Sequence, residues 1–189
     1  MKEPKEEGFA QYRNWTIVNF LVSAAPRRKS VINIRLRDVD LDNGIVEMLH
    51  VKGGKKRPTY LSPMMSKILI KYMKIRGGAP DDYLFPTQYG KKMTLSGISS
   101  AIKRYSSERG IAITSMHRFR NTFGCKWLKA GGSAKELQEI FNHSTPKMTD
   151  HYVRWYTTNY QENFMRLNPL DTLEQKTSNK GNFIKRARN

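Results

Sequence analysis

The stretch SAKELQEIFNHSTPKMTDHY, residues 133–152, contains two helix starts separated by a short break. Ser133 and Glu136 have the spacing of a capping box, in which each side chain satisfies a backbone N–H group of the other residue. Thr145-Pro146 is a second start, because proline lacks the N–H group that the first helical turn leaves unpaired. The pattern predicts two consecutive helices with a break near residue 143. The predicted inward face of the first helix is apolar: Leu137, Ile140 and Phe141.

Upstream of this stretch, five segments have helical spacing of apolar residues or a recognisable helix start. The predicted helices cover residues 14–25, 30–36, 62–77, 94–109 and 114–129. In the first of them Trp15, Val18 and Val22 share one side, which we expect to be buried. Residues after 157 are predicted to form a short helical or extended tail.

Three short segments alternate apolar and polar residues, as strands with one buried face do. They cover residues 39–41, 45–51 and 58–61, and the turn sequences Asp42-Asn43-Gly44 and Gly53-Gly54-Lys55 separate them. The sequence therefore predicts an α+β fold, mostly helical, with one small three-stranded antiparallel sheet.

Composition excludes several classes of protein. A single cysteine, Cys125, excludes a disulfide framework and a cysteine zinc site, and no His-Glu-x-x-His pattern occurs, so we predict no metal and no cofactor. There is no apolar run of 18 residues and no signal-peptide core, which predicts a chain inside the cell that makes no membrane contact.

The chain is strongly basic. Its 189 residues include 34 Lys and Arg against 16 Asp and Glu, which gives a formal charge of +18. A polyanion, with nucleic acid the commonest, is the expected partner.

The positive charge is unevenly distributed. Residues 51–76 contain eight basic residues and no acid, and residues 27–29 form a second basic cluster. A third lies in residues 169–189, which we interpret as a basic C-terminal tail. The residues predicted to contact DNA phosphates are basic and lie in the first two clusters: Arg28, Lys29, Lys55, Lys56 and Arg57.

Four residues in the C-terminal half have the chemistry of phosphate binding and attack. His117 and Arg120 share one face of the predicted helix and together could clamp a phosphate. His143 lies at the break between two helices, and Tyr152 follows it by nine residues. A tyrosine can attack phosphorus when nearby cations lower its pKa. Tyr152 also belongs to a four-residue repeat with Tyr156 and Tyr160, which is the spacing of a packing stripe.

Taken in order, these residues resemble the catalytic set of the tyrosine recombinases, the phage integrases and Xer-type resolvases. The similarity extends over residues 13–153. Its six positions are Arg27, Lys52, His117, Arg120, His143 and Tyr152. Four departures from the family pattern stand out: Ser30 replaces an acid, Asn121 a histidine and Asn142 a glycine, and Arg28 is a rival for the first arginine.

The resemblance implies a catalytic domain over residues 1–168, with the N-terminal core-binding domain of the family absent. It implies that Tyr152 attacks a DNA phosphate to form a 3′-phosphotyrosyl link without metal or ATP. By the same resemblance Arg27, Arg120 and His143 bind the phosphate, Lys52 protonates the departing 5′-oxygen, and His117 accepts the tyrosine proton. A type IB topoisomerase-like activity and a catalytically inactive DNA-binding relative are the alternatives.

The resemblance also implies partners. These are double-stranded DNA with inverted-repeat core sites and further copies of the chain, assembled as a tetramer on DNA, with C-terminal tails exchanged between neighbours. The expected location is the cytoplasm of a bacterial or archaeal cell, in association with DNA, and the gene belongs to the cell or to a virus or other mobile element.

Overall fold

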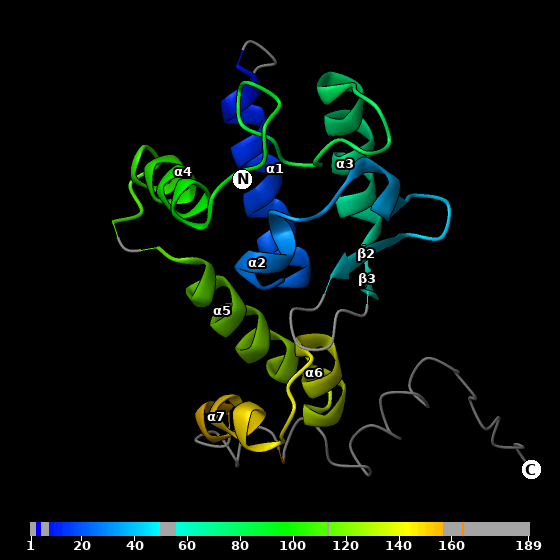
Figure 1. Cartoon of the computed structure of the whole chain (residues 1–189). Helices are drawn as coiled ribbons and strands as arrows, with labels where there is room; N and C mark the ends of the chain where they lie inside the picture. The colour runs from blue at the N-terminus through cyan, green and yellow to red at the C-terminus, as the bar shows by residue number, and fades with distance from the viewer. Residues whose placement is uncertain (1–2, 5–7, 50–55, 113, 157–163, 165–189) are drawn as a thin grey trace, which may run out of the picture.

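The computed structural model describes residues 3–4, 8–49, 56–112, 114–156 and 164. Helices dominate these residues, and a single three-stranded antiparallel sheet lies at one side of them (Figure 1), which confirms the predicted fold class. The helices are α1 (Phe9–Ala24), α2 (Arg28–Val31), the 3-10 helix η1 (Leu36–Asp38), α3 (Pro63–Arg76), α4 (Leu95–Ser107), α5 (Met116–Lys129), α6 (Ala134–Phe141) and α7 (Lys147–Tyr156). The strands are β1 (Val39–Asp40), β2 (Ile45–Leu49) and β3 (Lys56–Tyr60).

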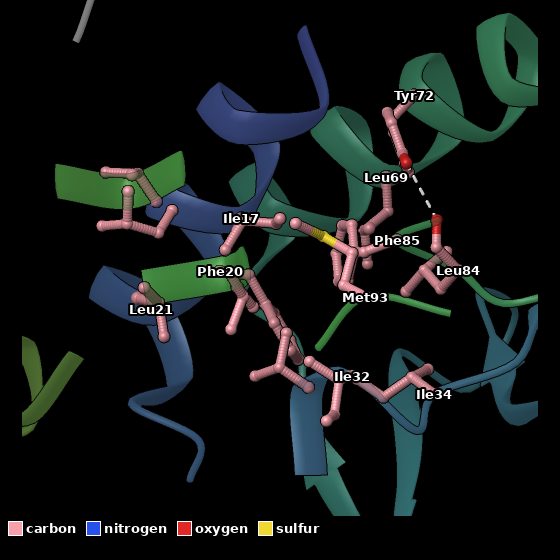
Figure 2. Packing of buried hydrophobic residues seen from close by; sticks show 14 of the residues in the cluster. Ile17, Phe20, Leu21, Ile32, Ile34, Leu69, Tyr72, Leu84, Phe85 and Met93 are labelled. Atoms are coloured by element: carbon pink, nitrogen blue, oxygen red, sulfur yellow. Dashed lines mark hydrogen bonds between the residues drawn. The ribbon is translucent and has the colours of Figure 1, made fainter. Parts of the chain in front are cut away.

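Helix α1 is the centre of the larger hydrophobic core. It packs against α3, α4 and α5, and its apolar residues are buried on nearly every side. Figure 2 shows Ile17 and Phe20 of this helix on the side that faces α3 and the loop after it, where Leu69, Phe85 and Met93 lie. In the same core the Tyr72 hydroxyl donates a hydrogen bond of 2.8 Å to the carbonyl oxygen of Leu84. The prediction for Val22 was wrong, because its side chain is 51% exposed.

The sheet has the predicted order, β1-β2-β3, with both pairs antiparallel. Val39 pairs with Val46, and Ile45 pairs with Tyr60, so the central strand β2 is bonded on both sides. The β1–β2 turn is held by Asp40, whose carboxylate accepts hydrogen bonds from the backbone N–H and the side chain of Asn43. Residues 50–55, which include the second predicted turn and Lys52, lie outside the described residues.

The helix predicted over residues 30–36 was wrong in extent. Helix α2 covers only Arg28–Val31, and a turn at Ile32 and Asn33 then leads into a short extended segment before η1. The backbone of this segment bonds to the loop after α3: Leu84 N–H donates to Ile34 O, and Leu36 N–H donates to Asp82 O. These partners are distant in sequence, and the β-branched residues of the segment favour the extended form that such pairing requires.

The first helix was predicted to begin at residue 14, which was wrong, because α1 begins at Phe9. Four other helix starts are where the capping residues predict them. Ser62, Thr94 and Ser115 each accept a hydrogen bond from the N–H group three residues later, at the start of α3, α4 and α5. Ser133 and Glu136 form the predicted capping box at the start of α6. Each cap satisfies donors that the first turn of a helix leaves unpaired.

A second, smaller core holds α5, α6 and α7 together. Its buried members include Leu128, Leu137, Phe141 and Tyr152. Ile140 was predicted to lie inward, but it is 38% exposed, because the side of α6 that carries Leu137 and Phe141 faces the core. Figure 1 shows α6 and α7 below the other labelled helices and strands, with α5 leading down to them. The residues predicted to carry the chemistry gather where this lower part meets the upper one.

Candidate active site

A groove of about 800 Å³ lies between α4, α5, α7 and the start of α2. Five of the six predicted catalytic residues line it: Arg27, His117, Arg120, His143 and Tyr152. The sixth, Lys52, lies outside the described residues. The fold thus gathers side chains that are up to 125 positions apart in sequence around one surface depression.

Arg120 lies at the floor of the groove and is only 9% exposed. Its guanidinium donates hydrogen bonds to the carbonyl oxygens of Ala25, at 2.6 Å, and Phe141, at 3.1 Å. It also lies 3.9 Å from the centre of the Phe141 ring. Burial, with a smaller contribution from the charge of Arg27, lowers the Arg120 pKa to about 10, so the side chain is still a cation at neutral pH. This side chain links the end of α1 to the end of α6.

Arg27 is the N-cap residue of α2, and its guanidinium donates to the carbonyl oxygen of Asn142 at 3.0 Å. Arg28, the rival for the first arginine, instead donates to the Ser99 hydroxyl on α4, also at 3.0 Å. Both arginines line the groove, but the charge of Arg27 is the one that bears on Arg120 and His143. The geometry therefore pairs Arg27 with Arg120 and directs Arg28 along α4.

His143 is held by both of its ring nitrogens. Nε2 lies 3.3 Å from Nη2 of Arg120, and Nδ1 lies 2.9 Å from the hydroxyl of Thr149. Arginine can only donate, so Nε2 is the acceptor and Nδ1 carries the proton and donates to Thr149. Burial first, and then the charges of Arg120 and Arg27, lower the His143 pKa to about 4. His143 is therefore neutral at pH 7.

Tyr152 projects from α7 onto α5 and is 5% exposed. Its hydroxyl donates a hydrogen bond of 3.2 Å to the side-chain oxygen of Asn121. Its ring stacks on His143, with centroids 6.3 Å apart, and meets the Phe141 ring edge-on. Burial raises the Tyr152 pKa, and the positive charge of Arg120 partly offsets this effect.

The remaining predicted residues differ in placement. His117 is exposed on α5 and lines the groove. Lys29 is exposed on α2, next to Arg28 in sequence, and does not line the groove. Arg57 is exposed on β3 and does not line the groove. Lys55 and the side chain of Lys56 lie outside the described residues.

Sequence reasoning missed three residues that hold the predicted ones. Asn121 binds the Tyr152 hydroxyl, and Thr149, which is 2% exposed, binds His143. Gly124 lies under the Tyr152 ring, where a Cβ atom would come within 2.9 Å of Tyr152 Cδ1. The one signal available was spacing, because Asn121 and Gly124 share a helix face with His117. Thr149 had no comparable signal.

Among the described residues, no group of three His, Cys, Asp or Glu side chains is arranged to hold a metal ion. No helix in that part of the chain is long and apolar enough to cross a membrane.

The sequence pattern of the phage integrase family matches residues 1–159. Tyrosine recombinase XerC of Leptospira interrogans serogroup Icterohaemorrhagiae serovar copenhageni is 27% identical over 163 residues, 85% of this chain and 52% of the relative. Tyrosine recombinase XerA of Thermococcus kodakarensis is 27% identical over 144 residues, 75% of this chain and 51% of the relative. The chain thus spans about half the length of these curated relatives.

Solved structures share the fold. The crystal structure of XerA recombinase superposes with a TM-score of 0.67 at 24% identity, covering 91% of this chain and 58% of that one. XerH site-specific recombinase bound to palindromic difH substrate, a post-cleavage complex, gives a TM-score of 0.70 at 19% identity, covering 84% of this chain and 47% of that one. With the family pattern matching 159 of 189 residues, the chain belongs to the phage integrase family.

Proposed function

We propose that the chain is a tyrosine-type site-specific recombinase that cleaves and rejoins double-stranded DNA through Tyr152. The observation that carries this proposal is the groove in which three arginines, three histidines and one tyrosine meet. Family membership supports the same reaction, as do the recombinase names of the relatives.

In the proposed cleavage step the Tyr152 oxygen attacks a backbone phosphorus, and the bond from phosphorus to the 5′-oxygen breaks. The products are a 3′-phosphotyrosyl link and a free 5′-hydroxyl. His117 takes the phenol proton, and Lys52 supplies a proton to the departing oxygen. The phosphodiester energy is retained in the link, so the 5′-hydroxyl of a second strand can reverse the step and rejoin the DNA.

The two arginines stabilise the charge that develops on the phosphate in the transition state. Arg27 and Arg120 are fixed by backbone carbonyls of Ala25, Phe141 and Asn142 before any ligand arrives, so their orientation costs little on binding. A bound phosphate brings negative charge next to His143, which favours its protonated form. His143 then donates from Nε2 to the phosphate instead of accepting from Arg120.

The DNA path follows from the cations at the groove. Arg28 and Lys103, with the hydroxyl groups of Ser99 and Ser100, extend the groove along α4. Lys29 continues the same side of the chain, and Lys55, Lys56 and Arg57 form the predicted contacts next to Lys52. Contacts of this kind bind phosphates and make the affinity fall steeply with salt. We further propose inverted-repeat sites, a tetramer on DNA with exchange of C-terminal tails, and a cytoplasmic, DNA-associated location.

The direct test is formation of a covalent adduct. A duplex site selected from a randomised inverted-repeat library is nicked so that the cleaved strand cannot be resealed, and protein–DNA adduct is measured on a denaturing gel. Wild-type protein is expected to form the adduct equally well with and without EDTA, and Tyr152→Phe is expected to form none while it still binds the site. Adduct formation by Tyr152→Phe would transfer the nucleophile role to Tyr156 or Tyr160. A comparison of two-site exchange with supercoil relaxation separates recombination from topoisomerase activity.

A further inference from the structure

The hydroxyl of Tyr152 has a partner to which no role has yet been given. Asn121, on α5, lies half-buried immediately after Arg120, and its side-chain oxygen accepts the Tyr152 hydrogen bond at 3.2 Å. The contact joins α5 to α7 across 31 positions of sequence. It fixes the one torsional freedom that ring packing leaves to a tyrosine, the direction of its O–H bond.

Gly124 supports this contact from below. A Cβ atom at this position would lie 2.9 Å from Tyr152 Cδ1, which is closer than Cβ atoms come to other heavy atoms in folded proteins, and 3.1 Å from Cγ. The missing side chain therefore lets the ring lie directly on α5. With the ring resting at Gly124, the hydroxyl reaches one turn back along the helix, to Asn121.

His117 lies one further turn along the same face, because it precedes Asn121 by four residues. One turn of an α-helix rises about 5.4 Å. His117, the proposed proton acceptor, is exposed in the groove, whereas the Tyr152 ring is buried. Asn121 thus lies between the nucleophile and the group that is to remove its proton.

A carboxamide suits this place because it has both an acceptor and a donor. Its oxygen accepts from the neutral phenol, and its NH₂ group donates to a phenolate after the amide plane rotates by half a turn. It has no significant basicity, so it cannot take the proton itself. A carboxylate could only accept, and an aliphatic side chain could do neither.

We infer that Asn121 is a positioning residue for the nucleophile, which holds the Tyr152 oxygen through its amide oxygen before ionisation and through its amide nitrogen afterwards. For ionisation the phenol O–H turns away from the amide oxygen and gives its proton to the imidazole of His117, which becomes an imidazolium. The amide then turns so that its NH₂ group donates to the phenolate. This inference rests on the proposed function, because it assumes that Tyr152 attacks a phosphate.

The first test needs no DNA. Tyrosine ring carbons labelled with ¹³C at Cζ are followed by NMR from neutral to alkaline pH, and the Tyr152 signal is identified by its loss in Tyr152→Phe. The groups facing this ring are Arg120 and Cys125 on α5, His143 before α7 and His151 on α7 itself. All of them stay in place in Asn121→Asp, so only the new carboxylate changes the surroundings. The Tyr152 pKa is expected to be higher in Asn121→Asp than in the wild type, and an unchanged value would show that the two side chains are not in contact.

The second test measures single-turnover cleavage of the nicked duplex against pH. Asn121→Leu loses both hydrogen bonds and is expected to cleave about tenfold more slowly at every pH. Asn121→Asp keeps the acceptor, but its carboxylate repels the phenolate. Its cleavage rate relative to the wild type is therefore expected to be low at neutral pH and to recover as pH rises. Asn121→His, whose ring has one acceptor and one donor, is expected to cleave within about threefold of the wild-type rate.

Gln11→Glu is the matched control for the amide-to-carboxylate change. It is exposed near the start of α1, roughly 20 Å along that helix from Ala25, and is expected to leave rate and pH dependence unchanged. Equal rates for wild type and all three Asn121 variants would overturn the inference while leaving the proposed function standing. A wild-type chain that forms no adduct on any selected site would overturn the proposed function, and the positioning role of Asn121 with it.

Discussion

The upper helices around α1 and the lower unit of α5, α6 and α7 are held together by different forces. The upper part has a continuous apolar core that runs through α1, α3, α4 and the sheet. The lower unit has a small core. Its link to the upper part combines apolar contacts of α5, through Met116 and Phe119, with two polar bonds, Arg120 to Ala25 and Arg27 to Asn142. The arginines proposed to bind phosphate are thus also among the ties between the two parts.

Because of this difference, substitutions at the proposed phosphate-binding arginines should also affect how the lower unit is packed. An apolar core depends on buried area and tolerates changes that conserve volume. A buried guanidinium bonded to two carbonyl groups depends on geometry, and its removal leaves both carbonyls without a partner. We therefore expect substitutions in the upper part to affect the whole chain, and substitutions at the arginines to act first on α6 and α7.

The largest expected effect is that of Arg120→Ala. Loss of the two charged hydrogen bonds to Ala25 and Phe141 is expected to destabilise the packing of α6 and α7 by about 3 kcal/mol, since each such bond contributes about 1.5–3 kcal/mol. Amide hydrogen exchange should become faster in α6 and α7 and stay unchanged in α1 and α3. Arg120→Lys keeps the charge but makes fewer of these hydrogen bonds, so its exchange rates in α6 and α7 should lie between those of the wild type and of Arg120→Ala.

Phe20→Ala is the reference for that measurement. Phe20 is fully buried in the upper core, and its truncation is expected to cost about 3–5 kcal/mol spread over the whole chain. If Arg120→Ala instead accelerated exchange uniformly, as Phe20→Ala should, the two parts would unfold as one unit and the comparison would fail.

Local signals in the sequence were sufficient for most of the helices and for the sheet. Ser62, Thr94 and Ser133 cap the helices that they were expected to start, because capping depends only on residues three positions apart. The order and pairing of the strands also followed from short turns. The segment after Val31 was misjudged, because its backbone partners, Asp82 and Leu84, lie about 50 residues away.

The residues of the candidate site also divide into those that the sequence predicted and those that it did not. Its chemical groups, such as Arg120 and Tyr152, were expected from residue type and from resemblance. Their supports were not, because Asn121 and Thr149 act through contacts between α5, α7 and the turn before α7. An asparagine on a helix has no local signal that distinguishes a solvent-facing amide from one that binds a tyrosine.

A smaller effect is expected from pH, through His143. Its pKa is about 4 in the folded chain and about 6.5 in the unfolded chain, so the unfolded state binds more protons between these values. Stability should be fully present above pH 6.5 and fall as pH drops toward 4. Because His143 is partly exposed, solvent screening reduces the effect. The free energy of unfolding at pH 7 and at pH 5 measures it.

His143→Gln removes the titrating group and is expected to reduce this pH dependence, whereas Phe20→Ala should lower stability at both pH values by the same amount. Equal slopes in His143→Gln and the wild type would mean that some other group carries the dependence.

The smallest expected effect on stability, with a larger one on cleavage, is that of Gly124→Ala. Alanine favours the helix by about 1 kcal/mol, but its Cβ would lie 2.9 Å from the Tyr152 ring, which has to move. The two contributions oppose each other, so the unfolding free energy should change by less than about 1 kcal/mol. The hydroxyl, however, moves with the ring and loses its hydrogen bond to Asn121, so adduct formation should fall.

Thr122→Ala is the matched control, because it also improves the helix propensity of α5, but its side chain is exposed and is turned about 200° around the helix from Gly124. If both variants form adduct at the same rate, the close packing of Tyr152 on α5 does not persist when DNA is bound, and the nucleophile is held by something other than α5 at the moment of attack.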